Sequence, residues 1–136
     1  MKMAIAAMVL GLATPVAAPE LRLDVTTREP GGSIAVAVYR DADSFRRGEG
    51  PVASRIVPRT GPVTAVVLTG LAPGRYAVAA FHDTDGNGDL TLWPFGLPKE
   101  AYGFSNDARG RFGPPTFEAA AIDLPPAGTH SALALR

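Results

Sequence analysis

One stretch of this chain, DTDGNGDL at residues 83–90, places oxygen-bearing side chains at every second position. Calcium takes six to eight hard oxygen ligands, and an acidic chain bent by glycine can direct several of them to one point. The stretch matches the start of an EF-hand loop, with Gly88 where the sharp turn needs glycine. It therefore predicts a calcium-type ion as cofactor, with the ligands Asp83, Asp85, Asn87 and Asp89.

The EF-hand pattern ends there, because Pro94 stands where the bidentate glutamate is expected. The missing ligands must come from elsewhere in the chain. Glu100, Asp107 and Glu118 are the acidic candidates, and we include Glu100 in the predicted metal set. The alternative is an Asx-rich turn that needs no ion. Several carboxylates in one short loop repel one another unless something neutralises them, which favours the ion.

His82 directly precedes the acidic stretch. It could be a metal ligand or a general base, but the simpler interpretation is a strand-end imidazole that holds a loop carbonyl. His130 falls in a terminal turn and suggests no role. A zinc site is not expected, since the chain has no cysteine and no second histidine near His82.

Aromatic residues follow the acidic stretch. They could form a platform that stacks on sugars or peptides, or a satellite core that packs the segment onto the sheet. Interleaved prolines favour a stiff, well-packed segment, and we therefore expect the satellite core. The residues concerned are Trp93, Phe95, Tyr102, Phe104 and Phe112.

The elements that must position these residues are short strands. Alternating apolar and polar residues, or short apolar runs between Pro and Gly turns, predict them at residues 21–25, 33–40, 51–57, 63–68, 76–81, 117–124 and 131–135. We expect the fourth and fifth to form a hairpin, and one helical turn at residues 43–47 with Asp41 or Asp43 as its cap. The fold class is all-β: an antiparallel β-sandwich of about seven strands with one long ordered loop, residues 81–118.

The N-terminal sequence predicts that the protein is exported. A basic start is followed by the apolar run 4–13 and small residues up to Ala18. This is the layout of a secretory signal peptide, and the run is too short to span a bilayer. We expect residues 1–18 to be the signal peptide, residues 19–136 to be a single β-sandwich domain, and the protein to be periplasmic or secreted. Thirteen basic and thirteen acidic residues balance, which gives no electrostatic footprint for nucleic acid.

The same stretch carries a family resemblance. HDTDGNGDL, then FGLPKEAYGFSNDARGRFGPPTFEAA, resemble the signature of domain of unknown function 2141 (DUF2141), a family of exported bacterial proteins. The resemblance spans about residues 33–135. It implies a secreted or periplasmic β-sandwich, transthyretin-like or immunoglobulin-like, and it implies no activity.

We therefore expect a non-enzymatic binding or interaction module of the cell envelope, stabilised by calcium, with a protein, peptide or carbohydrate partner. Two alternatives stay open at this point. One is an envelope hydrolase that uses His82, Asp83 and Glu100 as its acid–base set. The other is a carbohydrate- or peptide-binding module that uses Trp93 and Tyr102.

Overall fold

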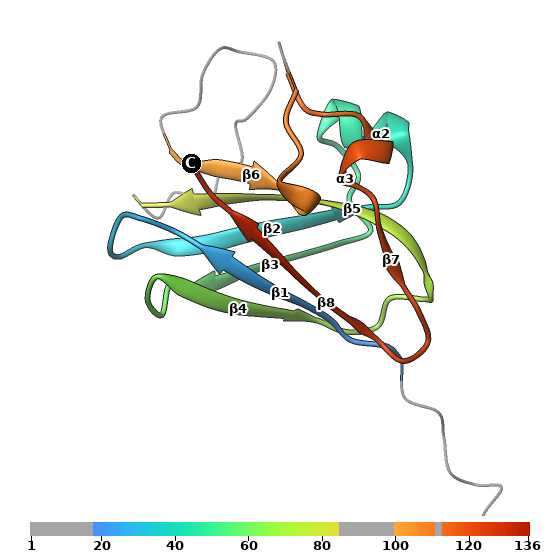
Figure 1. Ribbon diagram of the computed structural model, residues 1–136, viewed down its shortest axis with the longest axis horizontal. Helices are drawn as coiled ribbons and strands as arrows, with labels where there is room; N and C mark the ends of the chain where they lie inside the picture. Colours follow the sequence, from blue (N-terminus) through green and yellow to red (C-terminus); the bar gives the residue numbers. More distant parts are fainter. Residues whose placement is uncertain (1–17, 85–99, 111–112) are drawn as a thin grey trace, which may run out of the picture.

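Two β-sheets packed face to face form the framework of the protein (Figure 1). The computed structural model describes residues 18–84, 100–110 and 113–136. The smaller sheet has the strand order β4-β1-β8 and the larger one the order β3-β2-β5-β6, with β7 paired to β5. The strands are β1 Leu21–Thr26, β2 Ser33–Tyr39, β3 Ala53–Pro58, β4 Val63–Leu68, β5 Gly74–Asp83, β6 Tyr102–Phe104, β7 Ile122–Leu124 and β8 Thr129–Ala134. The predicted all-β sandwich is confirmed, although β8 runs parallel to β1.

The core lies between the two sheets. In β1 every second residue is buried, because one side of the small sheet faces the core and the other faces solvent. In β2 both faces are buried. Its larger side chains Ile34, Val36 and Val38 enter the core, while Ala35 and Ala37 face outward and are covered by other elements.

A third, smaller layer covers part of the outer face of the large sheet, above β2 and β5 in Figure 1. It contains the helices α2 Ala42–Arg47 and α3 Phe117–Ala120. The Asp41 side chain, one of the two predicted caps, caps α2 by accepting a 2.8 Å hydrogen bond from the Ser44 amide. Phe45 of α2 is buried and packs edge-on against Tyr39, Phe104 and Phe117.

Two local predictions are wrong. Residues 117–124 form α3 and then β7 rather than one strand, because Thr116 caps a turn of alanine-rich helix through a 3.1 Å bond from the Ala119 amide. The fourth and fifth strands, β4 and β5, form no hairpin. They pair with β1 and β2 respectively, so the turn between them crosses from one sheet to the other.

The predicted long loop 81–118 is also shorter than expected. Strand β5 continues to Asp83, and β6 adds to its edge at Tyr102–Phe104. A 3-10 turn at Ser105–Asp107 follows β6. Residues 85–99 and 111–112 lie outside the described part of the chain. Within the described part, no helix is long and apolar enough to cross a membrane.

The two sides of the sandwich differ. On one side β8 crosses over to β6, and Tyr102 and Arg136 exchange backbone hydrogen bonds of 3.2 and 3.1 Å; we call this the closed seam (Figure 1). On the other side the edge strands β3 and β4 follow one another in the chain, and in the described residues no backbone hydrogen bond joins them. We call this the open seam. The side chain of Arg55 bridges it, with Nη1 2.6 Å from the Val67 carbonyl oxygen.

Candidate functional site

The predicted metal ligands fall at the end of β5 and just before β6. Asp83 is the last residue of β5 and is buried, whereas Glu100 is half-buried and precedes β6 by two residues. The other predicted ligands, Asp85, Asn87 and Asp89, lie outside the described residues. Among residues 18–84, 100–110 and 113–136, no three His, Asp or Glu side chains gather closely enough to hold a metal ion. The described residues therefore contain two of the predicted ligands and no complete site.

Glu100 forms hydrogen bonds with Thr84, the residue that follows Asp83. Its Oε2 accepts hydrogen bonds from the Thr84 amide at 2.8 Å and from the Thr84 hydroxyl at 3.3 Å. Hydrogen bonds to an ionised carboxylate are stronger than those between neutral groups. The bonds bring the two ends of the segment 85–99 together. We call this arrangement of Asp83, Thr84 and Glu100 the loop root.

His82 supports the loop root from inside the sandwich. Its side chain is 1% exposed, and Nε2 lies 2.7 Å from the Gly31 carbonyl oxygen. Because a carbonyl only accepts, Nε2 carries the hydrogen in this bond. The other ring nitrogen, Nδ1, has no hydrogen-bond partner in the described chain. The predicted role of His82, a strand-end imidazole that holds a loop carbonyl, is confirmed.

The turn that supplies this carbonyl approaches the loop root closely. Gly32 has φ +69°, and a Cβ at this position would overlap the Asp83 carbonyl oxygen and lie 2.8 Å from the Thr84 Cα. Only glycine fits both the backbone conformation and the space. The sequence shows this Pro-Gly-Gly segment as a strand break, but nothing local shows that it packs against residues fifty positions away.

This geometry does not match the acid–base set of the hydrolase interpretation. That interpretation needs His82, Asp83 and Glu100 to converge in an open cleft. Instead, His82 and Asp83 are both buried, and Glu100 bonds to Thr84. A hollow of about 410 Å³ does exist elsewhere, and its lining residues are Ala42, Asp43, Arg46 and residues 114–118.

The described aromatic residues pack as a satellite core. Phe104 is buried, and Tyr102 contacts it edge-on at a centroid distance of 6.0 Å. Tyr102 also packs beside Phe81 on the outer face of the large sheet. For Tyr102 and Phe104 the satellite-core prediction is confirmed. Trp93, Phe95 and Phe112 lie outside the described residues.

The remaining acidic candidates lie on other elements. Asp107 binds the Ala134 amide through Oδ1 at 2.9 Å, which ties the 3-10 turn to β8. Glu118 is exposed in α3 beside the 410 Å³ hollow. Buried Ser105, at the start of the same 3-10 turn as Asp107, accepts a 2.9 Å hydrogen bond from the Val78 amide and donates to the Ala120 carbonyl. Asn106, at φ 60°, donates to the Ala121 carbonyl at 2.8 Å.

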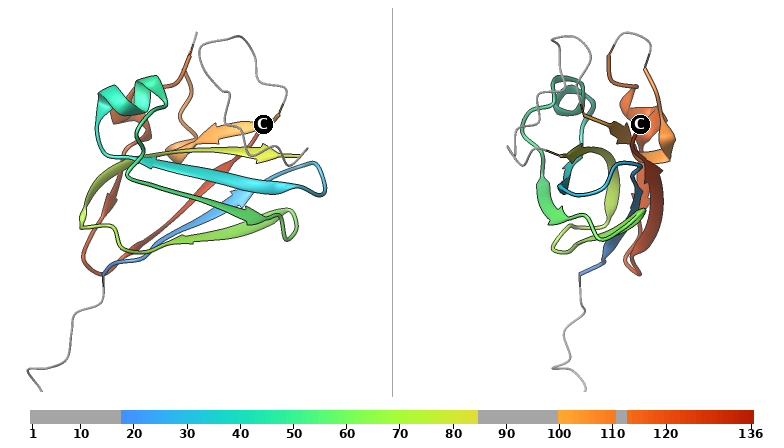
Figure 2. Two further views of the ribbon diagram at one scale, coloured as in Figure 1. Left: turned by 180° about the vertical axis from the view of Figure 1, so that it is seen from behind. Right: turned by 90° about the vertical axis from the view of Figure 1, so that its left-hand side faces the viewer.

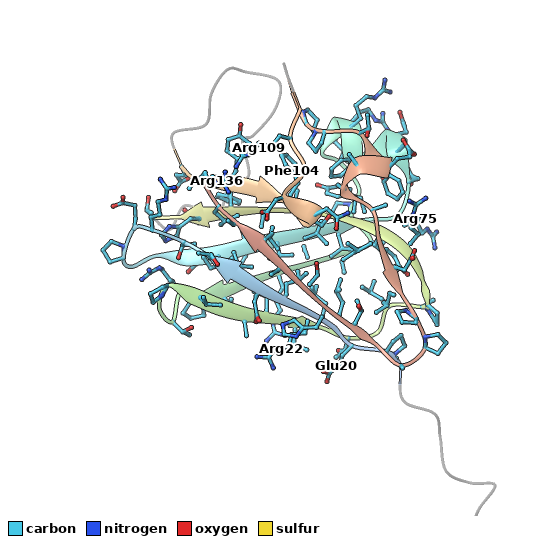
Figure 3. The ribbon with its side chains drawn as sticks, viewed as in Figure 1. Glu20, Arg22, Arg75, Phe104, Arg109 and Arg136 are labelled. Atoms are coloured by element: carbon cyan, nitrogen blue, oxygen red, sulfur yellow. The ribbon has the colours of Figure 1, made fainter. Side chains whose placement is uncertain are left out.

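His130, predicted to fall in a terminal turn, lies on β8. Its Nε2 is 2.6 Å from Oδ2 of Asp24 on the neighbouring strand β1. This hydrogen bond is the main cause that lowers the pKa of Asp24 below its ordinary value, with a smaller contribution from Arg22. Arg22 projects outward from the small sheet (Figure 3). The cluster is exposed to solvent, and its contribution to stability is small.

Comparison with known proteins gives one match. A family model described as "Uncharacterized protein conserved in bacteria (DUF2141)" matches residues 25–132. No curated protein and no solved structure matches the chain.

Proposed function

Because this chain belongs to the DUF2141 family of uncharacterised bacterial proteins, we propose its function from its own geometry. It acts as an exported, non-enzymatic binding module of the cell envelope, and a calcium-type ion organises its segment 85–99. The observation that carries this proposal is the bond of Glu100 to Thr84, which brings a second carboxylate to the loop root beside Asp83.

The chemistry of the loop root fits a hard cation. Asp83 and Glu100 supply carboxylate oxygens, the donor type that calcium prefers. Both ends of the segment 85–99 meet there, so its side chains Asp85, Asn87 and Asp89 start within a short chain length of Asp83. We propose these five residues as the ligand set. An ion bound among them would neutralise their mutual repulsion.

The described residues support binding over catalysis. His82, the strongest candidate for a general base, is buried and bonded to Gly31. A general base must lie within hydrogen-bond reach of the proton that it removes. We propose that the loop presents a surface to a protein, peptide or carbohydrate partner.

Thermal melting with and without calcium tests the proposal. A ligand that binds only the folded state stabilises it by about 2.7 kcal/mol at a hundred times its Kd. We therefore expect a melting temperature several degrees higher in millimolar calcium than in chelator. Asp85→Ala should abolish this rise, and Glu100→Gln should reduce it. Glu49→Gln, an exposed glutamate after α2, is the control and should leave the rise unchanged.

An identical melting temperature in calcium and in chelator would contradict the ion. A rise that Asp85→Ala and Glu100→Gln both leave intact would show that calcium binds elsewhere, and would contradict the proposed ligand set.

A further inference from the structure

The open seam exposes backbone hydrogen-bonding groups on β3. The Arg59 amide bonds to the Gly32 carbonyl, so these two residues form a hydrogen-bonded pair. Hydrogen-bonded and non-hydrogen-bonded pairs alternate along antiparallel strands, which fixes the direction of the backbone groups along β3. Residues 53, 55 and 57 therefore direct their backbone groups toward β2. Ser54 and Ile56 direct their N–H and C=O groups away from it, and both residues are exposed.

Strand β4 presents a matching edge across the seam. The Thr27 amide bonds to the Pro62 carbonyl, which places the outward backbone groups of β4 on residues 63, 65 and 67. The Arg55 bond to the Val67 carbonyl agrees with this assignment. Two strand edges thus face solvent along one side of the sandwich. Unpaired strand edges are templates for pairing with another chain.

Exposed apolar side chains accompany both edge strands. In the described chain the large hydrophobic residues that are exposed are Val52, Ile56 and Val63, with 42%, 56% and 53% of their surface accessible. Val52 and Ile56 lie just before and within β3, and Val63 begins β4. Ile56 pairs with Ala35 and so projects from the outer face of the large sheet, next to the free backbone groups of β3, whereas Val63 projects from the small sheet. A strand added to the edge of β3 would cover Ile56.

The two edge strands β3 and β4 carry charged side chains of one sign only. The chain has no acidic residue from position 50 to position 82. Arg55 bonds to a carbonyl, and Arg59 bonds to the Thr27 hydroxyl at 2.6 Å. Neither guanidinium forms an ion pair with any carboxylate of the described chain. A partner that carries carboxylates would supply the missing counter-charge.

We propose that the open seam is a docking site for an extended acidic peptide segment of a partner protein, which adds as a strand to the free edge of β3. The backbone of the peptide pairs with Ser54 and Ile56, and its apolar side chains contact Val52 and Ile56. Its carboxylates pair with Arg55 and Arg59. Strand addition of this kind draws affinity from backbone bonds and specificity from side chains.

The same features disfavour a second copy of the chain as the occupant. Two β3 edges paired with each other would bring Arg55 and Arg59 of both copies together, and like charges across a strand pair are destabilising. Pro51 and Pro58 flank the free edge and limit its length, because proline offers no N–H. This site lies on β3 and not on the loop root, so it does not depend on calcium.

Fluorescence anisotropy of the purified protein tests the proposal with a labelled peptide about eight residues long, the scale of strand recognition. The peptide alternates glutamate with valine and threonine. One control peptide has lysine in place of glutamate, and another has methyl groups on alternate backbone amides. We expect the acidic peptide to bind about tenfold more tightly than the lysine peptide at low salt. Backbone methylation should remove binding.

Variants of the protein locate the site. Ser54→Pro removes one outward N–H and leaves the β2 pairing intact, and we expect it to weaken binding about tenfold. Arg55→Glu combined with Arg59→Glu should abolish the preference for the acidic peptide. Arg40→Glu, an exposed arginine outside the seam, is the matched control and should leave binding unchanged. Circular dichroism checks that each variant is folded.

Three outcomes would overturn the proposal. Equal binding of the acidic and lysine peptides would show that Arg55 and Arg59 do not select for carboxylates. Binding that is intact in folded Ser54→Pro protein would place the peptide away from β3. A dimer in sedimentation that Ser54→Pro dissociates would identify a second copy, and not an acidic peptide, as the occupant of this edge.

Discussion

The two seams of the sandwich join the same two sheets in opposite ways. At the closed seam, backbone bonds between Tyr102 and Arg136 connect β6 to β8, and the Asp107 side chain accepts a further bond from the Ala134 amide of β8. At the open seam, one exposed arginine bridges two free strand edges. Figure 2 shows the two layers of strands from the side. The closed seam fixes the fold, whereas the open seam leaves hydrogen-bonding groups available to a partner.

Part of the family signature lies at the closed seam. The segment FSN at residues 104–106 belongs to the closed seam, where every one of its side chains is packed or bonded. The resemblance alone did not show what these residues do. Their contacts show that they join the turn after β6 to β5 and α3, so this part of the signature has a structural role.

The largest expected effect tests the close packing of the closed seam. A Cβ on Gly103 would overlap the Ala134 carbonyl oxygen and lie 3.2 Å from a Leu135 methyl group, so the backbone itself would have to move. We expect Gly103→Ala to lower the free energy of unfolding by about 3 kcal/mol. Gly61→Ala, in the turn between β3 and β4, meets nothing within 4 Å. It should stay within about 0.5 kcal/mol of the parent.

Chemical denaturation measures both glycine variants. Equal effects of Gly103→Ala and Gly61→Ala would show that the closed and open seams are packed alike.

A second, smaller effect concerns the buried hydroxyl of Ser105, which joins the turn next to the closed seam to β5 and α3. Ser105→Ala would leave the Val78 amide without its partner inside the protein, at a cost of about 1–3 kcal/mol. Ser54→Ala, on the exposed edge of β3, should change stability by less than about 0.5 kcal/mol. Urea unfolding of the two variants gives the difference. A Ser105→Ala protein as stable as the Ser54→Ala protein would show that the Ser105 hydroxyl does not stabilise the fold.

The smallest effect concerns the exposed pair between β1 and β8. The hydrogen bond from His130 holds the pKa of Asp24 below its ordinary value of 3.8. The stabilisation is therefore present above that value and is lost as the pH falls through the lowered pKa. His130→Gln should raise the pKa of Asp24, measured by carboxyl NMR. The pKa of Asp41, lowered by its bonds from Ser44, is the internal reference and should stay unchanged.

Several features followed from the sequence because their causes are local. The helix α2 begins at Asp41, one of its two predicted caps, since the Asp41 side chain and the Ser44 amide are three residues apart. Strands β1, β2 and β4 follow their apolar patterns. Errors arose where one local pattern fits two structures. An alanine-rich run is compatible with a helix or a strand. A tight turn can join two strands of the same sheet or two strands of different sheets.

The acidic stretch at residues 83–90 also combines features set by local sequence with features set by tertiary contacts. Its sequence determined the residue types, the EF-hand-like spacing and the position of His82 at a strand end. Only the tertiary structure decided that His82 holds Gly31, that Gly32 must be glycine, and that Glu100 bonds to Thr84. These contacts join residues far apart in the chain. Sheet pairing brings them together, and the pairing depends on burial of the whole core rather than on any single stretch.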